Sequence, residues 1–143
     1  MSSDAPRCRP CRSSATEDTH LRNTRRQTGN WAEQAAAEFL LDQGLQLVSR
    51  NFSRKFGELD LIMFDDEILV FIEVRFRRNS IYGDGLSSVG GVKQRKIIAA
   101  AQAFLLSNPG LRFRACRFDV VAVSRTNYRP MFNWVSDAFS TYA

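Results

Sequence analysis

The spacing of hydrophobic residues changes from helical to strand-like within the first half of the chain. Apolar side chains between positions 32 and 40 recur every three or four residues, which predicts an amphipathic helix. Asn30 followed by Glu33 matches a capping box, and Gly44 is a typical C-terminal stop, so we expect the helix over residues 30–44. Alternating or β-branched and aromatic residues then predict three strands, over residues 45–52, 58–64 and 68–76.

The second half passes from loop to helix to strand. Residues 77–91 hold four glycines among polar residues, and we expect a loop long enough to carry function. Helical spacing returns over residues 92–106, a strand follows over residues 116–123, and a short edge strand over residues 131–135 precedes a terminal helical turn. The order αβββαβ with a last strand predicts an α/β fold, a mixed central sheet flanked by helices.

Length and composition place these elements in one domain. The chain has 143 residues, 44% of them hydrophobic, which suffices for a single core. Residues 1–27 carry six arginines, three acidic residues and almost no large apolar side chain, so we expect a flexible basic tail before a domain over residues 28–143. No apolar run approaches the roughly 20 residues of a membrane span. The absence of a signal-peptide pattern and the odd number of cysteines, three, predict a cytoplasmic protein with reduced thiols.

Two acidic residues are predicted to meet on neighbouring strands. If the second and third strands form a hairpin centred between Asp66 and Glu67, Asp60 lies directly opposite Glu73 on one face of the sheet. Buried like charges repel, so a positive charge is expected between them. One candidate is Arg75, on the same strand face as Glu73; the other is Mg²⁺ or Mn²⁺, which prefers oxygen ligands. The charge pattern alone fits a metal-free Asp–Arg–Glu triad as well as a metal site.

Each predicted helix carries one charged residue near its apolar face. Glu33 lies at the edge of the first apolar stripe, where it can reach the sheet, whereas Glu38 points away. The capping box is the simpler explanation of Glu33. Lys93 shares the apolar face of the second helix, where it either approaches the sheet or extends past the core edge into solvent.

Other charged residues fit ordinary structural roles. Arg95 and Lys96 project away from the apolar face, as surface charges that could at most contact phosphates. Asp119 lies on the same strand face as Arg117, which predicts a structural ion pair.

An ordered set of motifs resembles the YraN family, and the resemblance covers about residues 28–140. The motifs are Gly29-x-x-Ala32-Glu33-x-x-Ala36, Arg50-Asn51, Gly57-Glu58-Leu59-Asp60-Leu61-Ile62, Val70-Phe71-Ile72-Glu73-Val74-Arg75, Lys93 and Arg117-Phe118-Asp119-Val120-Val121. That family is similar to the PD-(D/E)xK nucleases, whose restriction-endonuclease-like fold includes the Holliday-junction resolvases.

The resemblance implies roles for five residues. It makes Asp60 and Glu73 the metal-binding acids and Glu33 an auxiliary acid. Arg75 stands where the nucleases usually have a catalytic lysine, and arginine stays protonated, so it can hold a phosphate but cannot accept a proton from water. Lys93 could supply the missing ammonium group if it reaches the same pocket.

The expected function is therefore a Mg²⁺-dependent endonuclease that cuts structured or branched DNA. Asp60 and Glu73 would bind the metal, and Arg75 and Lys93 would neutralise developing charge. The same resemblance suggests a homodimer, and the net charge of +5 suits a nucleic-acid partner. The first alternative is a protein that binds nucleic acid without cutting it, its acids tied up by Arg75. A second is a protein-interaction domain that uses an exposed sheet edge.

Overall fold

The computed structural model describes the backbone of residues 14–78 and 89–141, and the side chains of residues 24–78 and 89–141. The elements, in chain order, are α1 (Ser14–Asp42), β1 (Gln46–Arg54), β2 (Gly57–Asp65), β3 (Ile68–Arg77), α2 (Gly91–Ser107), the short 3₁₀ helix η2 (Pro109–Leu111), β4 (Cys116–Thr126) and β5 (Arg129–Phe139). The predicted α/β fold class is confirmed. Within the described residues, no helix is both long and apolar enough to cross a membrane.

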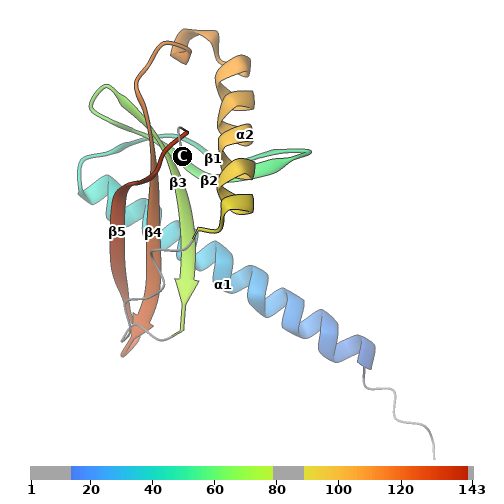
Figure 1. Ribbon diagram of the computed structural model, residues 1–143. Coiled ribbons are helices and arrows are strands. Elements are labelled where there is room, and N and C mark those ends of the chain that lie inside the picture. The colour runs from blue at the N-terminus through green and yellow to red at the C-terminus, as the bar shows by residue number, and fades with distance from the viewer. Residues whose placement is uncertain (1–13, 79–88, 142–143) are drawn as a thin grey trace, which may run out of the picture.

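The five strands form one mixed sheet in the order β1-β2-β3-β4-β5 (Figure 1). All neighbouring pairs are antiparallel except β3 and β4, which are parallel. A parallel pair needs a crossover connection, and α2 lies in that connection. The sheet order leaves β5 at an edge, as predicted.

Each face of the sheet is covered by one helix, so the domain has three layers. Ala32, Ala36 and Leu40 of α1 pack with one set of inward-facing strand residues, including Leu61 and Ile72. On the opposite face, buried residues of α2 pack with a second set of strand residues; the α2 residues are Ile97, Ala100, Ala101 and Phe104. Burial of both faces explains why β3 reads as an almost continuous hydrophobic run.

Helix α1 begins earlier than the hydrophobic spacing predicts. It starts at Ser14, so Asn30 and Glu33 lie inside the helix and the predicted capping box is wrong. Residues 14–27 of the segment expected to be a flexible tail are helical, and residues 1–13 lie outside the described residues. This part of the helix extends beyond the sheet (Figure 1). Its sequence lacks the apolar face that predicted the rest of the helix.

The end of α1 follows the prediction at Gly44. This glycine has a φ of +98°, in the left-handed region that favours glycine. Its N–H donates to the carbonyl of Leu41, and the N–H of Leu45 donates to the carbonyl of Leu40. Together these bonds form a Schellman motif, which satisfies the last carbonyls of the helix and turns the chain into β1.

The hairpin of β2 and β3 has the predicted register. Phe64 pairs with Leu69, and Asp65 pairs with Ile68 across a turn of Asp66 and Glu67. Asp66 adopts a φ of +51°, in the left-handed region common in tight hairpin turns.

The last strand is longer than predicted. β5 runs to Phe139, so the predicted helical turn after residue 135 is wrong. Pairing with β4 continues to the contact of Phe118 with Phe139, past an irregularity in the register. Most of the predicted glycine-rich loop, residues 79–88, lies outside the described residues.

Candidate active site

The predicted meeting of two acidic side chains is present where β2 and β3 separate. The regular pairing ends at Leu61 and Ile72, and Asp60 and Glu73 are the next residues on each strand. The backbone N–H of Val74 donates a 2.8 Å hydrogen bond to Oδ2 of Asp60, which fixes this carboxyl group against β3. When Glu73 carries a proton, its carboxyl group can donate a hydrogen bond to the Asp60 carboxylate. Glu73 is buried, with 7% of its surface exposed.

Burial makes full ionisation of this pair costly. Desolvation, together with the nearby Asp60 carboxylate, raises the pKa of Glu73 from 4.5 to about 7. Desolvation also raises the pKa of Asp60, although its hydrogen bond from Val74 acts in the opposite direction. A divalent cation between the two groups would favour the doubly ionised pair, because its positive charge stabilises carboxylates that burial shields from water.

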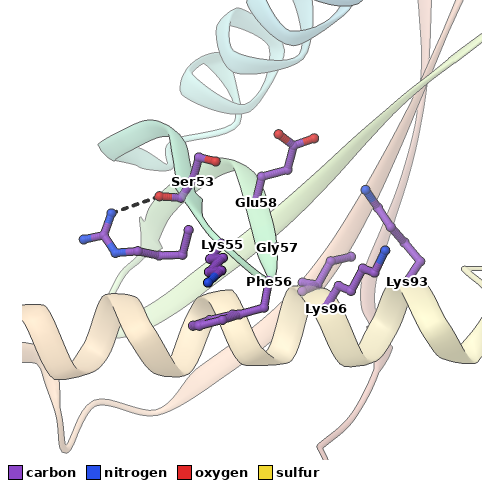
Figure 2. A pocket seen from close by; sticks show the side chains of 9 residues that line it. Ser53, Lys55, Phe56, Gly57, Glu58, Lys93 and Lys96 are labelled. Carbon is purple, nitrogen blue, oxygen red and sulfur yellow. Dashed lines mark hydrogen bonds between the residues drawn. The ribbon is translucent and has the colours of Figure 1, made fainter.

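Lys93 supplies one positive charge at this site. Its Nζ lies 3.4 Å from Oε1 of Glu73, and the Lys93 side chain is 39% exposed. It belongs to the first turn of α2 and rises from the helix toward the strands (Figure 2). Of the two placements considered for Lys93, the structure shows the approach to the sheet. Arg75 lies two residues after Glu73 and is half-buried, but the cation that contacts Glu73 in an ion pair is Lys93.

Glu33 adds a third acidic group from α1. It is half-buried, whereas Glu38 is exposed, as predicted. Burial and the Asp60 carboxylate raise the pKa of Glu33, and a hydrogen bond with Asn51 lowers it. Glu33 therefore lies within electrostatic reach of Asp60.

Asn51 is a site residue to which the sequence analysis gave no role. It lies in β1 between Arg50, which pairs with Leu61, and Phe52, so it stands across from Asp60. Its φ of +51° is in the left-handed region, which asparagine tolerates better than most residues. Such backbone conformations within strands concentrate at functional sites. The Arg50-Asn51 motif was the one available signal, but the sequence could not show that its amide faces Glu33.

The donor set suits a hard cation with few protein ligands. Asp60 and Glu73 offer only carboxylate oxygens, and Mg²⁺ is commonly held by one or two carboxylates, with water and phosphate filling the remaining positions. Within the described residues, no group of three or more histidine, cysteine, aspartate or glutamate residues could hold a metal ion. Mg²⁺ or Mn²⁺ would therefore be held by the two carboxylates of Asp60 and Glu73, and Glu33 is not grouped with them as a third ligand.

A cationic hollow adjoins the acidic pair through Lys93, and Figure 2 shows the side chains that line the hollow. It measures about 360 Å³ and lies between the β1–β2 turn and α2. Its charged lining residues are Arg54, Lys55, Glu58, Lys93 and Lys96. Lys96 was expected to project elsewhere as an ordinary surface charge, but it lies in this hollow with Lys93. The exposed ring of Phe56 completes the wall at the turn.

Gly57 allows α2 to lie this close to the turn. A Cβ built at Gly57 would overlap the carbonyl oxygen of Lys96 and lie 3.0 Å from its carbonyl carbon. Only glycine therefore permits this approach without a shift of the helix. The position of Lys93 relative to Glu73 follows from that contact, since Lys93 and Lys96 lie one helical turn apart.

The Arg117 and Asp119 pair has the structural role that was predicted. Nε of Arg117 donates to Oδ1 of Asp119 at 2.8 Å. Asp119 is fully buried and also accepts hydrogen bonds from Nε1 of Trp134 and the backbone N–H of Asp137. The network ties β4 to β5, on the face of the sheet that α1 covers.

Comparison with known proteins identifies the family. Residues 32–123 match the uncharacterised protein family UPF0102. The chain belongs to the UPF0102 family, also called the YraN family. A UPF0102 protein of Alcanivorax borkumensis is 44% identical over 120 residues, covering 83% of this chain and 96% of the relative. One of Nitrosococcus oceani is 45% identical over 116 residues, covering 81% and 94%. One of Xanthomonas campestris is 46% identical over 115 residues, covering 80% and 93%. The UPF0102 match includes all five predicted site residues.

Proposed function

We propose that this UPF0102 protein is a metal-dependent nuclease that hydrolyses phosphodiester bonds in DNA. The observation that carries the proposal is the buried pair of Asp60 and Glu73 with the Lys93 ammonium group 3.4 Å from Glu73. Two neighbouring carboxylates with a lysine in contact with one of them are groups that metal-dependent phosphodiester hydrolysis uses. The resemblance to PD-(D/E)xK nucleases supports the same assignment.

Each residue has a distinct task in the proposed reaction. Asp60 and Glu73 would hold Mg²⁺ or Mn²⁺, and the ion would supply an activated water and polarisation of the phosphate. Lys93 approaches from α2 and stabilises negative charge that develops on the phosphate oxygens. Arg75 stays protonated, so its task is limited to charge stabilisation and phosphate contact. Glu33, which forms a hydrogen bond with Asn51, would orient water at the edge of the site.

The cationic hollow gives the substrate a path to the acidic pair. Lys93 lines the hollow and also contacts Glu73, so a phosphate group bound in the hollow would lie near the carboxylates. Lys55 and Lys96 would contact the flanking phosphates of the strand, without reading its sequence. Branched DNA is the proposed preference on the resemblance to the resolvases.

One observation favours a second candidate, a protein of the same fold that binds nucleic acid without cutting it. Lys93 forms an ion pair with Glu73, and Arg75 replaces the usual strand lysine, so cations could balance the acidic pair without a metal. In that case the hollow would bind phosphate groups and no bond would break.

A cleavage assay tests the proposal on linear, flapped and branched duplex DNA with Mg²⁺ or Mn²⁺. We expect the wild type to cut at least one substrate and Glu73→Gln to lose activity by about 100-fold or more. Glu38→Gln is the matched control, because Glu38 is an exposed glutamate of α1, and it should cut as the wild type does. Equal cleavage by Glu73→Gln and the wild type would remove the mechanism.

A binding measurement separates the two candidates. Calorimetric titration with Mn²⁺ should show binding to the wild type and none to Asp60→Ala if the site is a metal centre. Absence of Mn²⁺ binding together with retained DNA binding would favour the non-catalytic protein. Cleavage by Arg75→Lys alone would show that the fold has lost its activity through that one residue.

A further inference from the structure

A second cationic hollow lies on the face of the sheet that α1 covers. It measures about 670 Å³ and forms where α1 passes the ends of β3 and β4. Trp31 and Phe76, which line it, pack against the core cluster under α1, whereas α2 and its Lys93 lie on the opposite face. This hollow is therefore separate from the candidate active site.

Three arginines from separate parts of the chain line it. Arg25 comes from α1, Arg78 follows β3, and Arg125 lies near the end of β4. Of the described residues that line the hollow, none is acidic. None of these arginines forms a salt bridge with a residue in the described part of the chain. Arginine stays charged at all physiological pH values, so the three guanidinium groups make the hollow attractive to an anion.

The arginine of β4 also forms a stack with an aromatic ring. The guanidinium carbon of Arg125 lies 4.2 Å from the centre of the Trp31 ring. The edge of Phe76 meets Trp31 at 6.0 Å and 84°, which holds the indole in place. A guanidinium group stacked on an indole keeps its N–H donors in its own plane, free for an anion, and its outer face can stack a planar base.

We propose that this hollow binds a nucleotide unit, a phosphate group joined to a planar base. Arg25 and Arg78 contact the phosphate, and the base stacks on the guanidinium plane of Arg125. Two sources supply a unit of this chemistry, a free mononucleotide and an unpaired nucleotide of a strand. The inference does not depend on the proposed reaction, because no residue of the acidic pair takes part.

The test is calorimetric binding to the full chain in a buffer with a metal chelator, so that the acidic pair does not recruit phosphate through a cation. The probes are inorganic phosphate, adenosine 5′-monophosphate and a short single-stranded oligonucleotide. We expect at least one nucleotide probe to bind about tenfold or more tightly than phosphate, because stacking adds to the charge contact. Equal affinity for adenosine 5′-monophosphate and the oligonucleotide indicates that a free nucleotide is the ligand. Tighter binding of the oligonucleotide indicates an unpaired nucleotide of a strand.

Variants assign the binding to this hollow. Arg125→Ala should weaken nucleotide binding by about tenfold or more, and Arg125→Lys should weaken it less, since the charge remains. Arg112→Ala is the matched control, because the guanidinium group of Arg112 stacks on the exposed Phe113 ring outside the hollow. Arg78→Ala provides a second removal of charge if Arg125→Ala does not fold. Nucleotide binding that survives both removals, or that is no tighter than phosphate binding, would overturn the proposal.

Discussion

Glu73 combines burial with two charged neighbours. It is buried, lies beside the Asp60 carboxyl group, and contacts Lys93 at 3.4 Å. A buried acid whose proton is released near neutral pH is typical of functional sites, where burial and like charges are arranged to shift pKa values. The same environment makes the stability of the protein depend on pH.

Glu73 should make the metal-free protein less stable as the pH rises toward neutrality. Its pKa is raised from 4.5 to about 7, so between these pH values the folded protein binds more protons than the unfolded chain. The stability contributed by Glu73 is thus fully present below the lower value and is lost as the pH rises through the higher one. Thermal denaturation in chelating buffer should show a melting temperature that falls from about pH 5 to about pH 7.5.

Two comparisons assign that pH dependence to Glu73. Glu73→Gln should flatten the decline, while Glu38→Gln, which changes an exposed side chain, should keep it. Mn²⁺ should raise the melting temperature of the wild type at neutral pH and leave that of Glu73→Gln unchanged. The same decline in Glu73→Gln as in the wild type would show that other groups cause it.

Lys93 should be needed for the chemical step and Lys96 only for binding. Both lysines line the hollow, but Lys93 is the one in contact with Glu73. If the protein cleaves DNA, Lys93→Met should lower kcat by about 100-fold, the usual effect of removing one group that stabilises transition-state charge. Lys96→Met, the matched control, should mainly raise KM. Single-turnover kinetics separates the two effects, and equal loss of kcat in both variants would contradict this division.

Residues separated by a regular hairpin could be paired from the sequence. The turn at Asp66 and Glu67 fixed the register, and the register placed Asp60 opposite Glu73. The partner of Glu73 could not be chosen in the same way, because Lys93 lies on another element and the helical spacing shows only which face it occupies. Asn51 was missed for a similar reason, since a left-handed residue inside a strand has no period that reveals it.

At the scale of elements, hydrophobic spacing located the helices and strands that form the core. It failed at the start of α1 and at the end of β5. The first part of α1 extends beyond the sheet, so its helix has no apolar stripe, and the start of the stripe near Ala32 was taken for the start of the helix. β5 was predicted too short because pairing with β4 continues across an irregularity that the sequence does not mark.

The packing of α2 against the β1–β2 turn should depend on Gly57. Gly57→Ala places a methyl group against the Lys96 backbone, so α2 must move and carry Lys93 away from Glu73. We expect a loss of about 1–3 kcal/mol in the free energy of unfolding, as for other overpacked sites. Gly110→Ala is the control, because a Cβ there meets nothing within 4 Å and the φ is not positive.

Chemical denaturation measures both glycine variants. Gly110→Ala should change stability by no more than about 0.5 kcal/mol. Metal binding is a second measurement. A displaced α2 leaves Asp60 and Glu73 in place, so Gly57→Ala should bind Mn²⁺ as the wild type does while its DNA cleavage falls. A Gly57→Ala protein as stable and as active as the wild type would show that α2 is not held by this contact.

At the scale of the whole molecule, a cationic hollow lies on each face of the sheet, and the hollow on the α2 face adjoins the acidic pair. The net charge is +5, and the described hollow beside the acidic pair concentrates four cationic side chains against one acidic one, Glu58. Such a surface attracts a polyanion over several ångströms and does so without sequence preference. The strength of that attraction can be measured by its response to salt.

DNA binding by the Glu73→Gln protein, which should not cut its ligand, should weaken steeply with salt concentration. The logarithm of the binding constant falls linearly with the logarithm of the salt concentration, by about 0.9 for each phosphate contact to a duplex. Lys55→Ala and Lys96→Ala should each reduce this slope by about 1, and the double variant by about 2, since each lysine would neutralise a phosphate. Arg112→Ala should leave the slope unchanged, because Arg112 lies outside the hollow. Fluorescence anisotropy over a range of salt concentrations gives the slopes of the Glu73→Gln parent and of the four variants made on it. If the lysine variants keep the slope of the parent, DNA is not held in the hollow beside the acidic pair, and the path proposed for the substrate must lie elsewhere.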